Sequence, residues 1–183
     1  MSVFRSRGFT LIELMVTVAI AAILLTIGVP SFTKLMTKNQ LSGEIQTLQG
    51  TINFARSEAI KRGSRVSICK SNNQSTCSGN WSDGWIIFVD RESGGSIGTR
   101  DGSDLDADEP LLRVFPALPS DYTLNTNSFT NYITYNRLGM ANNNGTFVFC
   151  KGSDETTARA IIVTRTRPRI ATDVDSITSC ESP

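Results

Sequence analysis

The hydrophobic residues near the start of the chain form two different patterns, one before and one after Pro30. Residues 9–29 are almost continuously apolar, and about 21 residues suffice for a helix to cross a hydrocarbon core of ~30 Å. After Pro30, apolar residues recur at alternating spacings of four and three, which is typical of an amphipathic helix. They are Leu41, Ile45, Leu48, Ile52, Ala55 and Ala59. Together the two patterns predict one helix of about fifty residues that ends near Gly63.

Pro30 lies inside this predicted helix, where a proline removes a backbone hydrogen bond and clashes with the preceding turn. We therefore expect a kink or local melting at Pro30, and Gly28 just before it lowers the cost. The apolar half should lie in a membrane or a filament core, and the amphipathic half should pack on a sheet.

From Ser64 onward the pattern changes to short β-rich segments separated by turn residues. We predict strands at residues 65–69, 84–90, 111–115, 132–135, 146–150 and 160–166. The connections are too short for helical crossovers, so the strands should form an antiparallel sheet or a pair of sheets. The chain is thus predicted to be an α+β protein with four segments. These are a leader at 1–8, an apolar helix at 9–29, an amphipathic helix at 30–63 and a β-rich head at 64–183.

Glu13 interrupts the apolar run and follows a short basic leader that contains Arg5 and Arg7. A carboxylate inside a membrane segment is costly enough to indicate a function and a partner. The leader differs from an ordinary secretory signal, because the expected cleavage point precedes the apolar run. A new N-terminus at Phe9 would place its α-ammonium near Glu13 of a neighbouring subunit, where each charge compensates the other.

Composition narrows the functional classes. The 183 residues are enough for one domain and an anchor. Lys and Arg number 18 against 17 Asp and Glu, so nucleic acid would have to bind through a local patch. The chain has no His, which is the usual general base and the commonest metal ligand, and no nucleophile with a base to activate it. We therefore predict that it is not an enzyme and has no cofactor and no metal site.

The cysteines are predicted to form disulfides. Cys69, Cys77, Cys150 and Cys180 all follow the apolar run, on the side that would be exported. Four cysteines allow three connectivities. We favour Cys69 with Cys77 and Cys150 with Cys180, because each pair is the nearest in sequence and the second would hold down the tail. The spacing of the first pair is too long for a structural zinc site.

An acidic segment lies between the second and third predicted strands. It contains Asp101, Asp104, Asp106, Asp108 and Glu109. Alternating aspartates begin calcium-binding loops, but here the sixth position is Glu109 instead of Gly and the twelfth is Phe115 instead of Glu. A solvated acidic loop is the favoured interpretation of residues 101–109, and calcium binding is the alternative.

Three arginines near the C-terminus, Arg165, Arg167 and Arg169, recur at every second residue, a period that on a strand directs all three to one face. Pro168 cannot donate to a ladder, which predicts a sheet edge or a position beyond it. Two readings stay open. The arginines grip phosphates, or they protect an edge strand from pairing and meet the acidic loop.

The first apolar residues resemble a known processing signal. Gly8-Phe9-Thr10-Leu11-Ile12-Glu13 is similar to the class III signal of type IV pilins and type II secretion pseudopilins. The resemblance implies that a prepilin peptidase cleaves after Gly8 and methylates the amine of Phe9. It also implies the type IV pilin fold, a long N-terminal helix packed on a β-rich head.

Three later segments, at residues 54–60, 84–90 and 133–139, resemble the FimT/FimU-like minor pilins and the GspH pseudopilins. This resemblance implies a minor pilin that joins a priming complex with other minor pilins and starts or caps a filament of the major pilin. It would wait in the bacterial inner membrane with its head in the periplasm and then move to the filament or its tip. A minor pseudopilin of type II secretion is an alternative.

A further alternative is a DNA receptor for natural transformation. In the FimT branch a Gly-Arg-x-Arg motif near the C-terminus is tied to binding of double-stranded DNA. Arg167-Pro168-Arg169 matches its last three positions, and Thr166 replaces its Gly.

Overall fold

The computed structural model describes residues 9–91, 96–100, 109–171 and 180, with the side chain of Ile27 excepted. One helix, α1 (Leu11–Arg62), runs through Pro30 without interruption, and the predicted kink there stays a prediction. It ends before Gly63, whose φ of 62° is the left-handed conformation that commonly terminates helices. The chain divides between Thr37 and Lys38 into two compact units. We call residues 11–37 the N-terminal segment of α1 and residues 38–62 its head segment.

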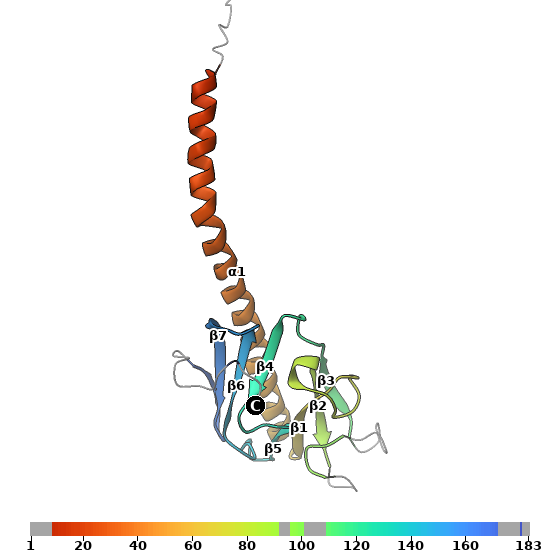
Figure 1. Ribbon diagram of the computed structural model, residues 1–183. Helices are drawn as coiled ribbons and strands as arrows, with labels where there is room; N and C mark the ends of the chain where they lie inside the picture. Colours follow the sequence, from red (N-terminus) through yellow and green to blue (C-terminus); the bar gives the residue numbers. More distant parts are fainter. Residues whose placement is uncertain (1–8, 92–95, 101–108, 172–179, 181–183) are drawn as a thin grey trace, which may run out of the picture. The chain divides into compact units, whose positions relative to one another are not determined.

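The described strands of the head form two antiparallel sheets of four strands each (Figure 1). Sheet A has the order β3-β2-β1-β5 and contains β1 (Arg65–Lys70), β2 (Trp85–Asp90), β3 (Leu111–Phe115) and β5 (Tyr132–Tyr135). Sheet B has the order β4-β6-β7-β8 and contains β4 (Tyr122–Thr126), β6 (Gly145–Lys151), β7 (Asp154–Val163) and β8 (Pro168–Ile170). A short 3-10 helix, η1 (Trp81–Asp83), precedes β2. The predicted α+β architecture is confirmed.

Strand prediction was wrong in three places. The sequence pattern did not indicate β4 or β8, and it placed the sixth strand at residues 160–166 whereas β7 begins at Asp154 and ends at Val163. The first residues of β7 are exposed and polar, so their extended conformation comes from the turn and pairing with β6 and leaves no apolar signal. In β4, Tyr122 and Leu124 do alternate inward, but the strand is only five residues long.

The core of the head lies between the head segment of α1 and one face of each sheet. The apolar stripe predicted for this segment is buried throughout, with Leu41, Leu48 and Ile52 at 0% exposure. Sheet A contributes Val66, Ile68, Trp85, Ile87, Ile133 and Tyr135 to this cluster, and sheet B contributes Tyr122, Leu124, Phe147, Phe149, Ile161 and Val163. Period two on each strand and periods three and four on the helix thus converge on one core.

Candidate assembly site

Thr10 caps the first turn of α1, and Glu13 lies within that turn. The Thr10 hydroxyl accepts a hydrogen bond from the Glu13 amide at 3.3 Å, and the Thr10 carbonyl accepts one from the Leu14 amide at 3.2 Å. Thr10 is thus the N-cap and Glu13 the third helical residue, the spacing of a capping box. A carboxylate here is stabilised by the partial positive charge of the helix N-terminus. The capping role of Thr10 is not among the sequence predictions, although Thr-x-x-Glu signals it.

The side chain of Glu13 is exposed, and within the described part of the chain it forms no salt bridge. Phe9 is described and is 79% exposed. Gly8 lies outside the described residues, so cleavage after Gly8 and methylation of Phe9 stay predictions. The arrangement leaves the carboxylate accessible to a group from another molecule.

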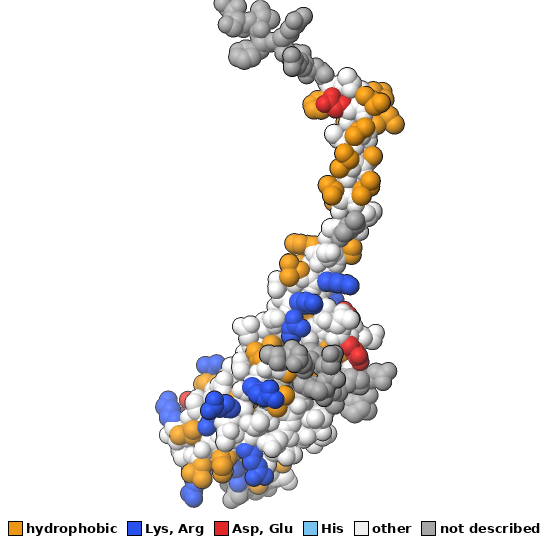
Figure 2. All heavy atoms as spheres, turned by 90° about the vertical axis from the view of Figure 1, so that its left-hand side faces the viewer, with side chains coloured by type: hydrophobic (Ala, Val, Ile, Leu, Met, Phe, Trp, Pro, Cys, Tyr) orange, Lys and Arg blue, Asp and Glu red, His pale blue; other side chains and the backbone are white. Residues whose placement is uncertain are grey.

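The N-terminal segment of α1 exposes its apolar side chains on all sides. Every large apolar side chain described from Phe9 to Met36 is more than half exposed. Figure 2 shows the hydrophobic side chains covering this part of the helix. The helix is long and apolar enough to cross a membrane, a property that signal sequences near an N-terminus share.

Hydroxyl groups within this segment are satisfied inside the helix. The Thr17 hydroxyl donates to the Leu14 carbonyl at 2.8 Å, and the Thr26 hydroxyl donates to the Ile23 carbonyl at 2.7 Å. Such internal bonds remove the cost of placing a hydroxyl in an apolar medium. Glu13 is therefore the one ionisable group between Phe9 and Thr33 that an apolar environment would have to accommodate.

The two disulfides have the favoured connectivity. Cys69 is bonded to Cys77 and Cys150 to Cys180. The first closes a loop over the outer face of sheet A, where Cys69 packs with Ile86 and Phe88. The second holds residue 180 on the outer face of sheet B, and the Asn125 side-chain amide donates to the carbonyl of Cys180 at 3.3 Å.

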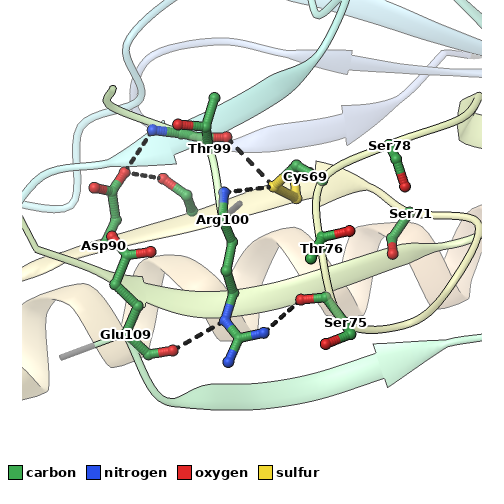
Figure 3. Close-up of a disulfide and its surroundings, with 12 residues drawn as sticks. Cys69, Ser71, Ser75, Thr76, Ser78, Asp90, Thr99, Arg100 and Glu109 are labelled. Atoms are coloured by element: carbon green, nitrogen blue, oxygen red, sulfur yellow. Dashed lines mark hydrogen bonds between the residues drawn. A yellow bond between two sulfur atoms is a disulfide. The ribbon is translucent and has the colours of Figure 1, made fainter. Parts of the chain in front are cut away.

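Arg100 joins the first disulfide loop to Glu109, which lies just before β3 (Figure 3). It is 3% exposed, and its Nε donates to the Glu109 carbonyl at 3.1 Å while Nη1 donates to the Ser75 carbonyl. Its backbone amide donates to Cys77 Sγ at 3.1 Å. A buried guanidinium satisfied by carbonyls braces the loop. The sequence did not single out Arg100, because it lies beside an acidic segment and resembles a surface residue.

The arginines occupy a turn and an edge strand, which corrects the prediction of one continuous strand. Arg169 lies in β8, but Arg165 and Arg167 lie in the turn before it. The hydroxyl of Thr164 closes that turn by donating to the Arg167 carbonyl at 2.9 Å. Pro168 explains the break, because it lacks an amide proton and begins a new strand, β8, at the predicted edge of sheet B.

All three arginine side chains are exposed, and none forms a salt bridge to a residue that the structure describes. The backbone amide of Arg165 donates to Asn144 Oδ1 at 2.8 Å, which fixes the turn against the loop before β6. The turn therefore exposes Arg165 and Arg167 on an ordered backbone, and β8 exposes Arg169.

Most of the acidic segment lies outside the described residues, namely Asp101, Asp104, Asp106 and Asp108. Calcium binding there stays an alternative interpretation. In the described part of the chain, no cluster of three or more acidic, His or Cys side chains is placed to hold a metal ion.

Comparison with known proteins agrees with this architecture. A family model described as "Type II transport protein GspH" matches residues 44–166, and a model of the "Prokaryotic N-terminal methylation motif" matches residues 4–29. The "Prepilin peptidase-dependent protein D" of Escherichia coli is 49% identical over 43 residues, which are 24% of this chain and 30% of that protein. The match thus spans less than a third of the curated relative.

Two solved structures share the fold. Both are crystal structures of the type IV minor pilin FimU of Pseudomonas aeruginosa. One is 18% identical, with a TM-score of 0.56, and the alignment covers 79% of this chain and 95% of that chain. The other is 16% identical, with a TM-score of 0.51 and coverage of 81% and 98%. The predicted type IV pilin fold is confirmed. The chain belongs to the GspH family of pilins and pseudopilins, which are structural subunits and not enzymes.

Proposed function

We propose that this chain is a minor pilin of a type IV pilus that joins other minor pilins to start or cap a filament of the major pilin. A prepilin peptidase cuts after Gly8, and the N-terminal segment of α1 holds the protein in the inner membrane with its head in the periplasm. The observation that carries the proposal is the exposed Glu13 on the first turn of an entirely exposed apolar segment.

The electrostatic argument concerns the ammonium of a processed Phe9. In a filament core or membrane, an isolated ammonium or carboxylate is costly, and pairing the two offsets the desolvation of both. Glu13 is only one helical turn from Phe9, so the exposed carboxylate and the new N-terminus lie near the same end of the segment. One subunit can therefore offer its carboxylate to the amine of the next.

The test compares Glu13→Gln with Glu155→Gln, an exposed carboxylate in β7 of the head. We expect Glu13→Gln to reach the membrane at the wild-type level but to be lost from the sheared filament fraction. Glu155→Gln should be incorporated normally. Mass spectrometry of the filament protein should find methylated Phe9 as the first residue. Normal incorporation of Glu13→Gln, or an N-terminus other than Phe9, would contradict the proposal.

A minor pseudopilin of type II secretion is the alternative within the same architecture, because the matching family model carries that description. The same fractionation separates the two. Recovery of the wild-type chain with type IV pili supports the pilus, whereas recovery only with an overproduced secretion pseudopilus supports the alternative.

DNA binding is a second candidate function, and the exposed Arg165, Arg167 and Arg169 are the observation that favours it. Each arginine that neutralises a phosphate should add about one to the slope of log affinity against log salt. We would measure duplex DNA binding by the full chain in detergent at two salt concentrations. Replacing the three arginines with alanine should abolish salt-sensitive retardation, and Arg113→Ala, an exposed arginine of β3, should not. No retardation of the wild-type chain at low salt excludes this function.

A further inference from the structure

The head exposes an unusual concentration of apolar side chains where α1 ends. Five large hydrophobic residues of the described head are exposed, and three of them, Ile60, Leu138 and Met140, lie in this region at 51%, 69% and 42% exposure. The other two are Ile97 and Val114. We call Ile60, Leu138 and Met140 the end patch. Figure 2 shows hydrophobic and basic side chains together at the lower end of the head.

The turn after β5 is held against the helix, with Gly139 next to Ile60. Arg56 on α1 donates from Nε to the Gly139 carbonyl at 3.0 Å. Gly139 has a φ of +72°, and a Cβ there would lie 2.6 Å from Ile60 Cδ1, so the backbone of the turn rests directly on Ile60. A side chain at position 139 would be strained by the positive φ and would displace the Ile60 side chain.

Asn136 fixes the shape of this turn. Its side-chain oxygen accepts from the amides of Leu138 and Met140, each at 3.0 Å, and its carbonyl accepts from the Gly139 amide at 2.8 Å. The side chains of Leu138 and Met140 therefore project from a backbone that is already ordered. Because this backbone is already ordered, binding costs it little conformational entropy. Such a turn is therefore well suited to form a contact.

Two cations lie next to the end patch. Arg137 is exposed beside Leu138 in the turn, and Arg56 on α1 contacts that turn through the Gly139 carbonyl. The carboxylate of Glu58 is paired with Arg62 at 2.6 Å and with Lys61 at 3.7 Å, and the hydrogen bond from Arg62 lowers its pKa. Glu58 therefore does not offset the charges of Arg56 and Arg137. The rim of the patch is therefore positively charged.

We propose that the end patch docks the head of a different pilin subunit, through an apolar surface bordered by carboxylates. An apolar centre with arginine at its border is the composition of protein interfaces. A symmetric contact with a second copy would place the cationic rims against each other. A nucleic acid would meet three apolar side chains where it needs cations. The inference rests on the function proposed above.

The location of the patch suits such a contact. The chain enters the head at Lys38 and reaches the end patch at Ile60, about 33 Å farther along the head segment of α1. The contact surface thus lies at the opposite end of that helical segment from the junction with the N-terminal segment. A subunit held by its N-terminal segment keeps the patch free for a neighbour.

Photo-crosslinking in cells tests the occupant. The full chain would carry p-benzoylphenylalanine in place of Leu138 or, as a control, in place of Val114, which is exposed on sheet A. We expect position 138 to form an adduct with the head of another pilin, and the crosslinked peptide to contain apolar residues next to Asp or Glu. Position 114 should not form this adduct. An adduct with a second copy, with the same chain or with DNA, or no adduct at position 138, would overturn the proposal.

Incorporation assays separate this inference from the proposed function. Leu138→Ser and Arg137→Glu should each lower recovery of the chain with its partner pilin about tenfold, whereas Val114→Ser should not. Reversing the charge of the crosslinked carboxylate should restore the Arg137→Glu variant. Normal recovery of Leu138→Ser together with loss of Glu13→Gln refutes the end patch but keeps the function. Normal recovery of both variants refutes the function itself.

Discussion

The two segments of α1 are parts of one helix with opposite relations to the rest of the chain. In the N-terminal segment every described large apolar side chain is more than half exposed. In the head segment, apolar residues of the same kinds, such as Leu41 and Leu48, are 0% exposed. The difference lies in the spacing. A continuous run offers no polar face to solvent, whereas spacings of three and four place one apolar stripe against the sheets.

The comparison shows where each segment finds its stability. The head segment buries its stripe within the same chain, so its contribution is part of the folding free energy of the head. The N-terminal segment leaves apolar side chains uncovered, each worth about 1.5–3 kcal/mol on burial. In the proposed function, lipid or neighbouring subunits supply that burial.

The sharpest way to break the comparison is a pair of leucine truncations. Leu48→Ala should lower the free energy of unfolding of the head by about 2–5 kcal/mol, because it opens a cavity in the core. Leu24→Ala removes the same atoms from a side chain that is 66% exposed and should leave the unfolding of the head unchanged. Urea titration of the full chain in detergent, followed by near-UV circular dichroism, measures both. Equal destabilisation would mean that the N-terminal segment also stabilises the head.

The disulfides give the next largest effect. Cys150 and Cys180 are separated by 30 residues and Cys69 and Cys77 by 8. Because a longer loop loses more chain entropy when it is closed, removing the Cys150–Cys180 bond should cost about 3.5 kcal/mol and removing the other about 2.5 kcal/mol. Double alanine variants of each pair, unfolded under the same conditions, test this order. If removing the Cys69–Cys77 bond cost more, that bond would stabilise the head by more than the entropy of closing its loop.

Sequence patterns predicted the elements whose side chains face one core and missed those defined by pairing or caps. The helix stripe was readable because its apolar residues recur at helical spacing, and β2 was readable because it is a continuous apolar run bounded by turn residues. The short strand β8 was not, because Pro168 starts it and only its pairing with β7 makes it a strand. Arg100 resembles a surface cation in sequence. Its burial depends on carbonyls from two separate loops, which no local pattern encodes.

Arg100 sharpens the comparison for charged groups. Two carbonyls of the head accept hydrogen bonds from this buried guanidinium, whereas Glu13 is left exposed on the N-terminal segment. Arg100→Met should lower the free energy of unfolding by about 1.5–3 kcal/mol, since it removes hydrogen bonds from a charged donor and leaves two partly buried carbonyls without it. Arg167→Met, at an exposed position, is the matched control and should be neutral. Thermal unfolding of both variants tests this prediction. Equal melting temperatures would show that Arg100 does not stabilise the head.

The smallest expected effect compares two carboxylates on the same helix. The hydrogen bond from Arg62 lowers the pKa of Glu58 below its ordinary value of 4.5, so this pair stabilises the head above that pH and the stabilisation is lost as the pH falls through the lowered value. Glu58→Gln should therefore cost about 0.3–0.5 kcal/mol at pH 7, and the difference from wild type should disappear in acid. Glu13→Gln should change the unfolding of the head at neither pH, because its carboxylate has no partner in the described part of the chain. Urea titrations at pH 7 and pH 3 test both variants. A pH-dependent effect of Glu13→Gln on the head would show that the two segments of α1 are energetically coupled. The N-terminal segment would then also contribute to the folding free energy of the head.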